Sequence, residues 1–172
     1  MNRRRILERA ADALAAWNRG DAEGTVAHVA EDVIWRDVAL GMPLDGRAAL
    51  ADGVRRYMTA FPDLHVEVTS STLDGPRLAQ EWTVTGTHNE TGRWTRVYGA
   101  TVTTFDDDAV MIEGSLYWNP LTVLRQLGLA DQTPTVATRI SATSAVVAPT
   151  ARKARAAQSG GARTRKSSPA AT

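Results

Sequence analysis

Residues 111–129, MIEGSLYWNPLTVLRQLGL, constrain the fold more than any other stretch of the chain. Residues 111–118 are rich in apolar and aromatic side chains, which predicts a strand. Pro120 must end this strand because proline cannot donate a ladder hydrogen bond, and it also suits the first position of a helix. Leucines then repeat at helical spacing as far as Gly128. A strand that leads directly into a short helix is therefore predicted to close an α+β domain.

Hydrophobic periodicity divides the preceding residues into helices and strands. Apolar residues three or four positions apart predict helices, alternation predicts strands, and Gly, Pro, Asn and Asp mark turns. The predicted helices cover residues 3–18, about 22–30 and 50–61, and the predicted strands cover residues 33–38, 64–73, 77–88, 93–105 and 111–118. Residues 39–46 are predicted to be a loop. The order ααβαββββ predicts a curved, mostly antiparallel sheet that wraps a long helix as a cone and leaves a cavity.

Charge divides the chain into two parts. Residues 1–131 hold 13 basic and 19 acidic residues, a net charge of −6, whereas residues 132–172 hold seven basic residues and no acidic ones. The second part is rich in Ala, Ser, Thr, Pro and Gly and has no aromatic residue, so it cannot bury enough apolar surface to offset its ordering entropy. We therefore predict a folded domain over residues 1–131 and a disordered basic tail that makes at most weak contact with nucleic acid.

Several classes of protein are disfavoured by what the sequence lacks. Without cysteine there is no disulfide and no thiolate metal site, which agrees with a cytoplasmic location. The three histidines have no partners at metal-ligand spacing, so no metal is predicted. No stretch approaches membrane-spanning length, and no phosphate-binding or dinucleotide-binding motif is present, so neither a membrane nor a cofactor is predicted.

Three stretches are distinctive, in chain order: AFPDLHVEV (residues 60–68), EWTVTGTHNETG (residues 81–92) and YWNPLTVLRQLGL (residues 117–129). They resemble the SnoaL-like family, the polyketide cyclase branch of the nuclear transport factor 2-like superfamily. The resemblance spans roughly residues 5–129 and implies the cone fold, a small-molecule ligand in its cavity and a homodimer formed through the outer face of the sheet. It leaves the reaction open, because one fold hosts many functions.

Asp37 is the predicted catalytic residue. The run VIWRDVALGMPLDGRAAL (residues 33–50) resembles the ketosteroid isomerase segment in which an aspartate is the general base, and Asp37 falls on that aspartate. A carboxylate in an apolar cavity can accept a proton from a C–H beside a carbonyl, because desolvation favours its neutral form. In the alternative, Asp37 lies at the cavity mouth, solvated or paired with Arg36 or Arg47.

At other positions the chain lacks the residues that the isomerase and cyclase mechanisms use. The isomerase tyrosine would fall at Ala13 and its donor carboxylate near Thr101 or Val102, so steroid isomerase activity is not expected. The acid/base aspartate of the cyclases would fall at Leu116 or, with a register shift of one, at Ser115. The family's aspartate before the proline is Asn119 here. A direct transfer of the cyclase mechanism therefore fails.

The remaining candidates could line the cavity or donate a hydrogen bond to a ligand oxygen. The predicted substrate-binding residues are Trp35, Tyr57, Phe61, Trp82, His88, Tyr98, Leu116, Trp118 and Asn119, of which Tyr57, His88, Tyr98 and Asn119 are candidate donors. Together they predict a protein that binds a small apolar carbonyl compound, with cyclase-like or isomerase-like proton transfer by Asp37. The alternative is a non-catalytic binding or dimerisation module. A bare module of this kind should have a filled cavity.

Overall fold

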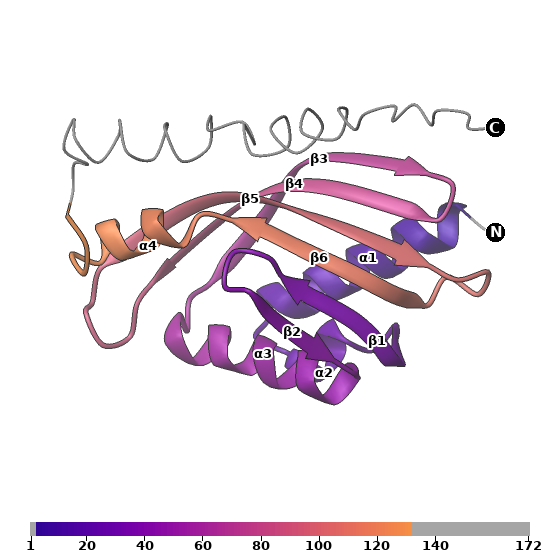
Figure 1. Ribbon diagram of the computed structural model, residues 1–172, viewed down its shortest axis with the longest axis horizontal. Coiled ribbons are helices and arrows are strands. Elements are labelled where there is room, and N and C mark those ends of the chain that lie inside the picture. Colours follow the sequence, from indigo (N-terminus) through magenta and orange to yellow (C-terminus); the bar gives the residue numbers. More distant parts are fainter. Residues whose placement is uncertain (1–2, 132–172) are drawn as a thin grey trace, which may run out of the picture. The chain divides into compact units, whose positions relative to one another are not determined.

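A computed structural model of the chain describes residues 3–131 (Figure 1). Its helices are α1 (Arg3–Asn18), α2 (Ala22–Thr25), α3 (Arg47–Ala60) and α4 (Pro120–Gln126). Its strands are β1 (Val29–Asp37), β2 (Met42–Asp45), β3 (His65–Asp74), β4 (Arg77–Thr87), β5 (Trp94–Phe105) and β6 (Met111–Trp118). The predicted basic tail lies outside the described residues. Within residues 3–131, no helix is both long enough and apolar enough to cross a membrane.

The six strands form one sheet in the order β2-β1-β6-β5-β4-β3. Only β1 and β6 pair in parallel, and every other neighbouring pair is antiparallel. The register shifts in β1, β3 and β5, and such irregularities bend strands. The curved sheet wraps α1, which lies behind the strands in Figure 1. The predicted α+β class and cone-shaped, mostly antiparallel sheet are confirmed.

The predicted second helix is much shorter than expected. Asp21 caps α2, because its carboxylate accepts a hydrogen bond from the Gly24 N–H at 2.8 Å. The helix nevertheless ends at Thr25, and β1 begins at Val29, which pairs with Met111 of β6. Gly24 and the β-branched residues after it disfavour a helix, so strand pairing determines the structure of residues 29 and 30.

Residues 39–46 were predicted to be a loop, but they contain the edge strand β2. This strand pairs antiparallel with β1 from Asp37↔Met42 to Ile34↔Asp45. Pro43 made residues 42–45 look unlike a strand in the sequence, because proline cannot donate a ladder hydrogen bond. Proline is nevertheless tolerated in a strand at the edge of a sheet. The tight turn between the two strands is closed by the Leu40 N–H, which donates to Asp37 Oδ1 at 3.1 Å. The extra strand therefore fixes the end of β1, where Asp37 lies.

The core consists of two buried apolar clusters. The first joins α1 to the ends of the β3–β5 strands and contains Ile6, Leu73, Leu78, Phe105 and Ala109. The second joins β1 and the residue that follows α2 to α3, and it contains Val26, Val29, Val33, Leu50 and Ala51. Members of both clusters also line the cavity described below.

Candidate functional site

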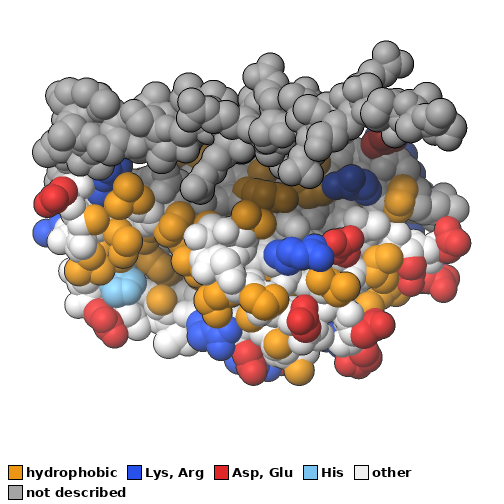
Figure 2. All heavy atoms as spheres, viewed as in Figure 1, with side chains coloured by type: hydrophobic (Ala, Val, Ile, Leu, Met, Phe, Trp, Pro, Cys, Tyr) orange, Lys and Arg blue, Asp and Glu red, His pale blue; other side chains and the backbone are white. Residues whose placement is uncertain are grey.

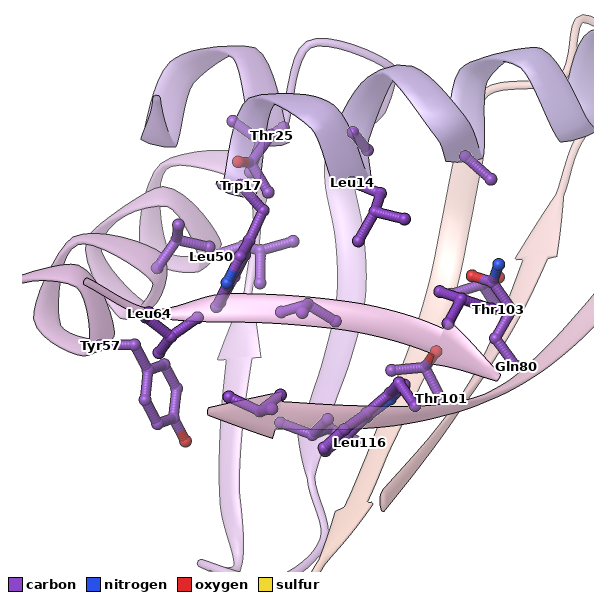
Figure 3. Close-up of a pocket in the computed structure, with 18 of the residues that line it drawn as sticks. Leu14, Trp17, Thr25, Leu50, Tyr57, Leu64, Gln80, Thr101, Thr103 and Leu116 are labelled. Carbon is purple, nitrogen blue, oxygen red and sulfur yellow. The ribbon is translucent and has the colours of Figure 1, made fainter. Parts of the chain in front are cut away.

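A cavity of about 290 Å³ lies between the inner face of the sheet and helices α1 and α3. Most of the residues that line it are apolar or aromatic. Figure 3 shows Leu14 and Trp17 pointing from α1 toward the strands, with Tyr57 on one side of the pocket and Gln80, Thr101 and Thr103 on the other. Its volume is at the lower end of the range of small-molecule sites, which is roughly 300–1,000 Å³.

Two tryptophan–glycine pairs keep this cavity open. Trp82 of β4 lies directly opposite Gly99 of β5, and Trp35 of β1 lies opposite Gly114 of β6. A Cβ atom on either glycine would overlap the indole ring of its partner. Because glycine has no side chain, each ring can lie over the neighbouring strand instead of standing upright in the cavity.

Asp37 is buried at the end of β1, with 4% of its surface exposed. Its Oδ2 accepts a hydrogen bond from the Tyr57 hydroxyl at 2.7 Å, and its Oδ1 accepts one from Trp118 Nε1 at 3.1 Å. With the Leu40 N–H, three donors replace hydration that the carboxylate loses on burial. Asp37 is not itself among the lining residues; Tyr57 and Trp118, which both line the cavity, connect it to that space.

The alternative placement of Asp37, at a solvated mouth beside an arginine, is wrong. The Arg36 guanidinium donates instead to Glu113 at 2.6 Å, and Arg47 pairs with Glu31. Side chains alternate along β1, so Arg36 lies on the opposite face of the strand from Asp37.

Tyr57 is the side chain that joins Asp37 to the cavity wall. Burial raises the pKa of its hydroxyl above the ordinary value, and the hydrogen bond to the Asp37 carboxylate raises it further. The phenol therefore stays protonated and remains a donor. Its ring lies between the indoles of Trp17 and Trp118, with a centroid separation of 6.4 Å in each case.

Two nitrogen atoms that belong to cavity-lining residues have no hydrogen-bond partner within residues 3–131. They are Trp17 Nε1 and Arg9 Nη1, both buried and both on α1. Neither residue is among the predicted substrate-binding residues, although the sequence indicates Trp17 as one of the aromatic residues that could line a pocket. A signal for Arg9 was present, because it lies three residues after Ile6 and four before Ala13, on the apolar side of the helix.

Six of the predicted binding residues line the cavity, and three do not. The six are Trp35, Tyr57, Phe61, Trp82, Leu116 and Trp118. Tyr98 lies on the outer face of the sheet and is 65% exposed, because it alternates with Val97, whose side chain lines the cavity. The Arg96 guanidinium lies 5.3 Å from the centroid of the Tyr98 ring.

His88 and Asn119 also lie outside the cavity lining. The Nδ1 atom of His88 accepts from the Thr91 N–H at 3.3 Å in the turn between β4 and β5, and its ring packs on Phe61. Asn119 caps α4, since its Oδ1 accepts from the Leu121 N–H at 3.0 Å. Both side chains therefore stabilise local structure. Within residues 3–131, no three His, Asp or Glu side chains are grouped so that they could hold a metal ion.

Comparisons with solved structures agree with this architecture. AclR, a hydroxylase candidate from Streptomyces galilaeus, is 28% identical over 82% of this chain and 94% of its own, with a TM-score of 0.65. A protein of ketosteroid isomerase-like fold from Catenulispora acidiphila, solved in complex with trimethylamine, is 21% identical over 74% of this chain and 98% of its own, with a TM-score of 0.67. IdmH, a polyketide cyclase candidate from Streptomyces antibioticus, is 22% identical over 72% of this chain and 98% of its own, with a TM-score of 0.64.

Comparisons of sequence place the chain in a family. No curated protein matches it. The model of the SnoaL-like domain matches residues 10–111, which is more than half of the chain. The three stretches that resemble the family therefore belong to a chain with the family's fold. The protein is a member of the SnoaL-like domain family.

Proposed function

We propose that the protein binds a small, largely apolar carbonyl compound in the cavity and transfers a proton at the carbon beside the carbonyl, with Asp37 as the base. The observation that carries this proposal is a buried carboxylate held only by donors, two of which, Tyr57 and Trp118, line an open apolar cavity. Apolar walls favour an apolar ligand, and a few polar groups at one end can orient it. Polyketide cyclase candidates among the solved relatives support the same class of ligand.

The proton transfer uses Asp37 and Tyr57 in turn. The Asp37 carboxylate takes the proton from the carbon beside the carbonyl, which leaves an enolate. The protonated carboxyl group is a weaker acceptor, so the Tyr57 hydroxyl is released from it and donates to the enolate oxygen. Asp37 then returns its proton to the ligand, and the carboxylate is regenerated. Trp118 and Leu40 hold the carboxylate in one orientation throughout.

Trp17 supplies a second donor for the ligand oxygen. Its indole N–H is buried and has no acceptor within residues 3–131, and its ring lies beside Tyr57. An unpaired buried donor costs free energy that a ligand carbonyl would recover. Trp17 follows Ala13 by one helical turn, so it offers a donor where the isomerase tyrosine is missing.

The test measures proton exchange and binding separately. 2-Tetralone, a small apolar ketone with acidic C–H groups, is incubated with the full chain in D₂O, and deuterium incorporation and binding of the ketone are each followed by NMR. The protein should accelerate exchange, Asp37→Asn should abolish the acceleration, and Asp32→Asn, an exposed position on the same strand, should retain it. Binding without acceleration would favour the alternative function, a non-catalytic binding module. Exchange that is unchanged in Asp37→Asn would end the assignment of the base.

We also propose a homodimer in which the outer face of the sheet pairs two subunits. Exposed apolar side chains on this face, such as Tyr98 and Tyr117, support the proposal. The cytoplasmic location and the weak contact of the basic tail with nucleic acid stay predictions from the sequence.

A further inference from the structure

The structure points to an anionic ligand, and we infer that the carbonyl compound carries a carboxylate or a similar oxyanion that Arg9 binds. This inference rests on the proposed function and specifies its substrate class. Arg9 lines the cavity, and its Nη1 atom is buried without a hydrogen-bond partner within residues 3–131. It forms no ion pair with any acidic side chain of those residues.

The other arginines of α1 differ from Arg9 in this respect. Arg3 donates to the Leu73 carbonyl oxygen at 3.1 Å, Arg4 pairs with Glu8 at 2.7 Å, and Arg5 lies 4.0 Å from Asp108. Each of them therefore has a partner outside the cavity. Arg9 alone among the four combines a place in the cavity wall with a buried, unpaired N–H group.

The position of Arg9 makes this unpaired group costly. Ile6, one turn earlier on α1, is fully buried, and Ala13, one turn later, lines the cavity. A guanidinium nitrogen in such a wall loses its water without gaining an anion. An oxyanion in the cavity would supply charge-assisted hydrogen bonds, which a planar guanidinium makes well.

Asp12, three residues after Arg9 on the same helix, does not take this role. Asp12 Oδ2 lies 3.7 Å from Nε2 of His28, a second basic side chain that lines the same cavity. Arg9 and His28 thus add two basic groups to the wall, while the Asp12 carboxylate is directed to the histidine. The cavity wall therefore holds the Arg9 guanidinium, whereas the carboxylate of Asp37 is connected to the cavity through Tyr57 and Trp118.

The spacing along α1 limits the kind of acid. Arg9 and Trp17 are eight residues apart, which corresponds to about 12 Å at the helical rise. If Trp17 binds the carbonyl oxygen, the oxyanion at Arg9 must be separated from the carbonyl by several carbon atoms. The expected ligand is therefore an apolar keto acid whose carboxylate is several carbon atoms away from its ketone, rather than a 2-oxo acid.

The test compares a matched acid and amide. N-phenyl-1-naphthylamine, a neutral dye that fluoresces in apolar sites, is bound to the full chain and displaced by 4-phenylbutyrate or by 4-phenylbutanamide. Wild-type protein should prefer the acid. Arg9→Met should weaken displacement by the acid about tenfold or more and leave the amide unchanged, because one charge-assisted interaction is lost. Arg4→Met removes the same charge from an exposed position of α1 and should change neither.

The possible outcomes separate this inference from the function on which it rests. Equal displacement by acid and amide in the wild type, or an equal loss in Arg9→Met and Arg4→Met, would overturn the anion site and leave the cavity intact. A dye that fails to bind to the wild type would instead count against the ligand cavity itself. Dye binding also reports whether a variant is folded. If the Arg9→Met variant fails to bind the dye, the Arg9→Gln variant is used in its place. Arg9→Lys, which keeps the charge, should retain most of the acid preference.

Discussion

Asp37 is surrounded by donors, and this determines how the site responds to substitution. Asparagine has nearly the same shape, but its amide nitrogen would face the Tyr57 hydroxyl, the Trp118 indole or the Leu40 N–H. We expect Asp37→Asn to lower the free energy of unfolding by about 1–3 kcal/mol, measured by urea denaturation, because a buried polar group loses its partner.

Asp32→Asn is the matched control for this prediction, since Asp32 is exposed on the same strand. It should change the free energy of unfolding by less than about 0.5 kcal/mol. If Asp37→Asn were as stable as the control, the three hydrogen bonds would not hold the carboxylate in solution.

The raised pKa of Tyr57 predicts a dependence of stability on alkaline pH. In the unfolded chain a tyrosine loses its proton near its ordinary pKa of about 10, whereas the folded protein holds the Tyr57 proton to higher pH. The contribution of this group is therefore fully present below the unfolded pKa and is lost as the pH rises through the folded pKa. The free energy of unfolding should fall above pH 10, and Tyr57→Phe should reduce that fall. Tyr98→Phe, at an exposed site, should retain it.

Sequence patterns predicted which aromatic residues lie near the cavity better than they predicted the face of the sheet on which a strand side chain lies. Tyr98 and Val97 are adjacent, and a strand reverses the side-chain face at every residue, so an error of one position moved Tyr98 to the wrong face. Asn119 was a cap rather than a ligand group, which the following proline indicated. The unpaired nitrogens of Arg9 and Trp17 were not predictable, because pairing depends on distant side chains.

At the scale of elements, the tryptophan–glycine pairs connect strand register to the shape of the cavity. A methyl group on Gly99 would overlap the Trp82 ring and the Tyr117 carbonyl oxygen. We expect Gly99→Ala to lower the free energy of unfolding by about 1–3 kcal/mol and to weaken dye binding, because the ring must tilt into the cavity.

A double variant tests whether the ring is the cause. Trp82→Leu should restore part of the stability lost in Gly99→Ala, so that the effects of the two substitutions are not additive. Simple additivity would show that strain at the Tyr117 backbone, rather than the tryptophan, accounts for the loss.

The elements themselves were predictable to different degrees. Long amphipathic or alternating segments such as α1 and β5 were found because their periodicity is sustained. The end of α2 and the whole of β2 were not predicted, because both elements are only four residues long. Helix α2 is short because β1 begins soon after it, and β2 is held by its pairing with β1. Their positions follow from the sheet and not from local preference.

At the scale of the whole molecule, the two faces of the sheet differ. Helices α1 and α3 contribute to the cavity on the inner face, and α1 lies behind the strands in Figure 1. Figure 2, in the same view, shows hydrophobic side chains among charged ones on the face toward the viewer. Exposed apolar residues on the outer face of the sheet include Ile34, Tyr98 and Tyr117. Such a face is typical of antiparallel sheets that pack against a partner.

This asymmetry predicts a homodimer through the outer face. Light scattering at tens of micromolar, roughly the range in which a moderate affinity populates the complex, should report twice the mass of the chain. Tyr98→Glu with Tyr117→Glu should shift the protein toward monomer, because a symmetric interface buries each new charge twice. Leu129→Glu introduces one such charge at an apolar residue outside the sheet that is about as exposed as Tyr98, and it should leave the mass unchanged. A monomeric wild type would remove the prediction, and a dimer that survives the double substitution would place the interface on another surface.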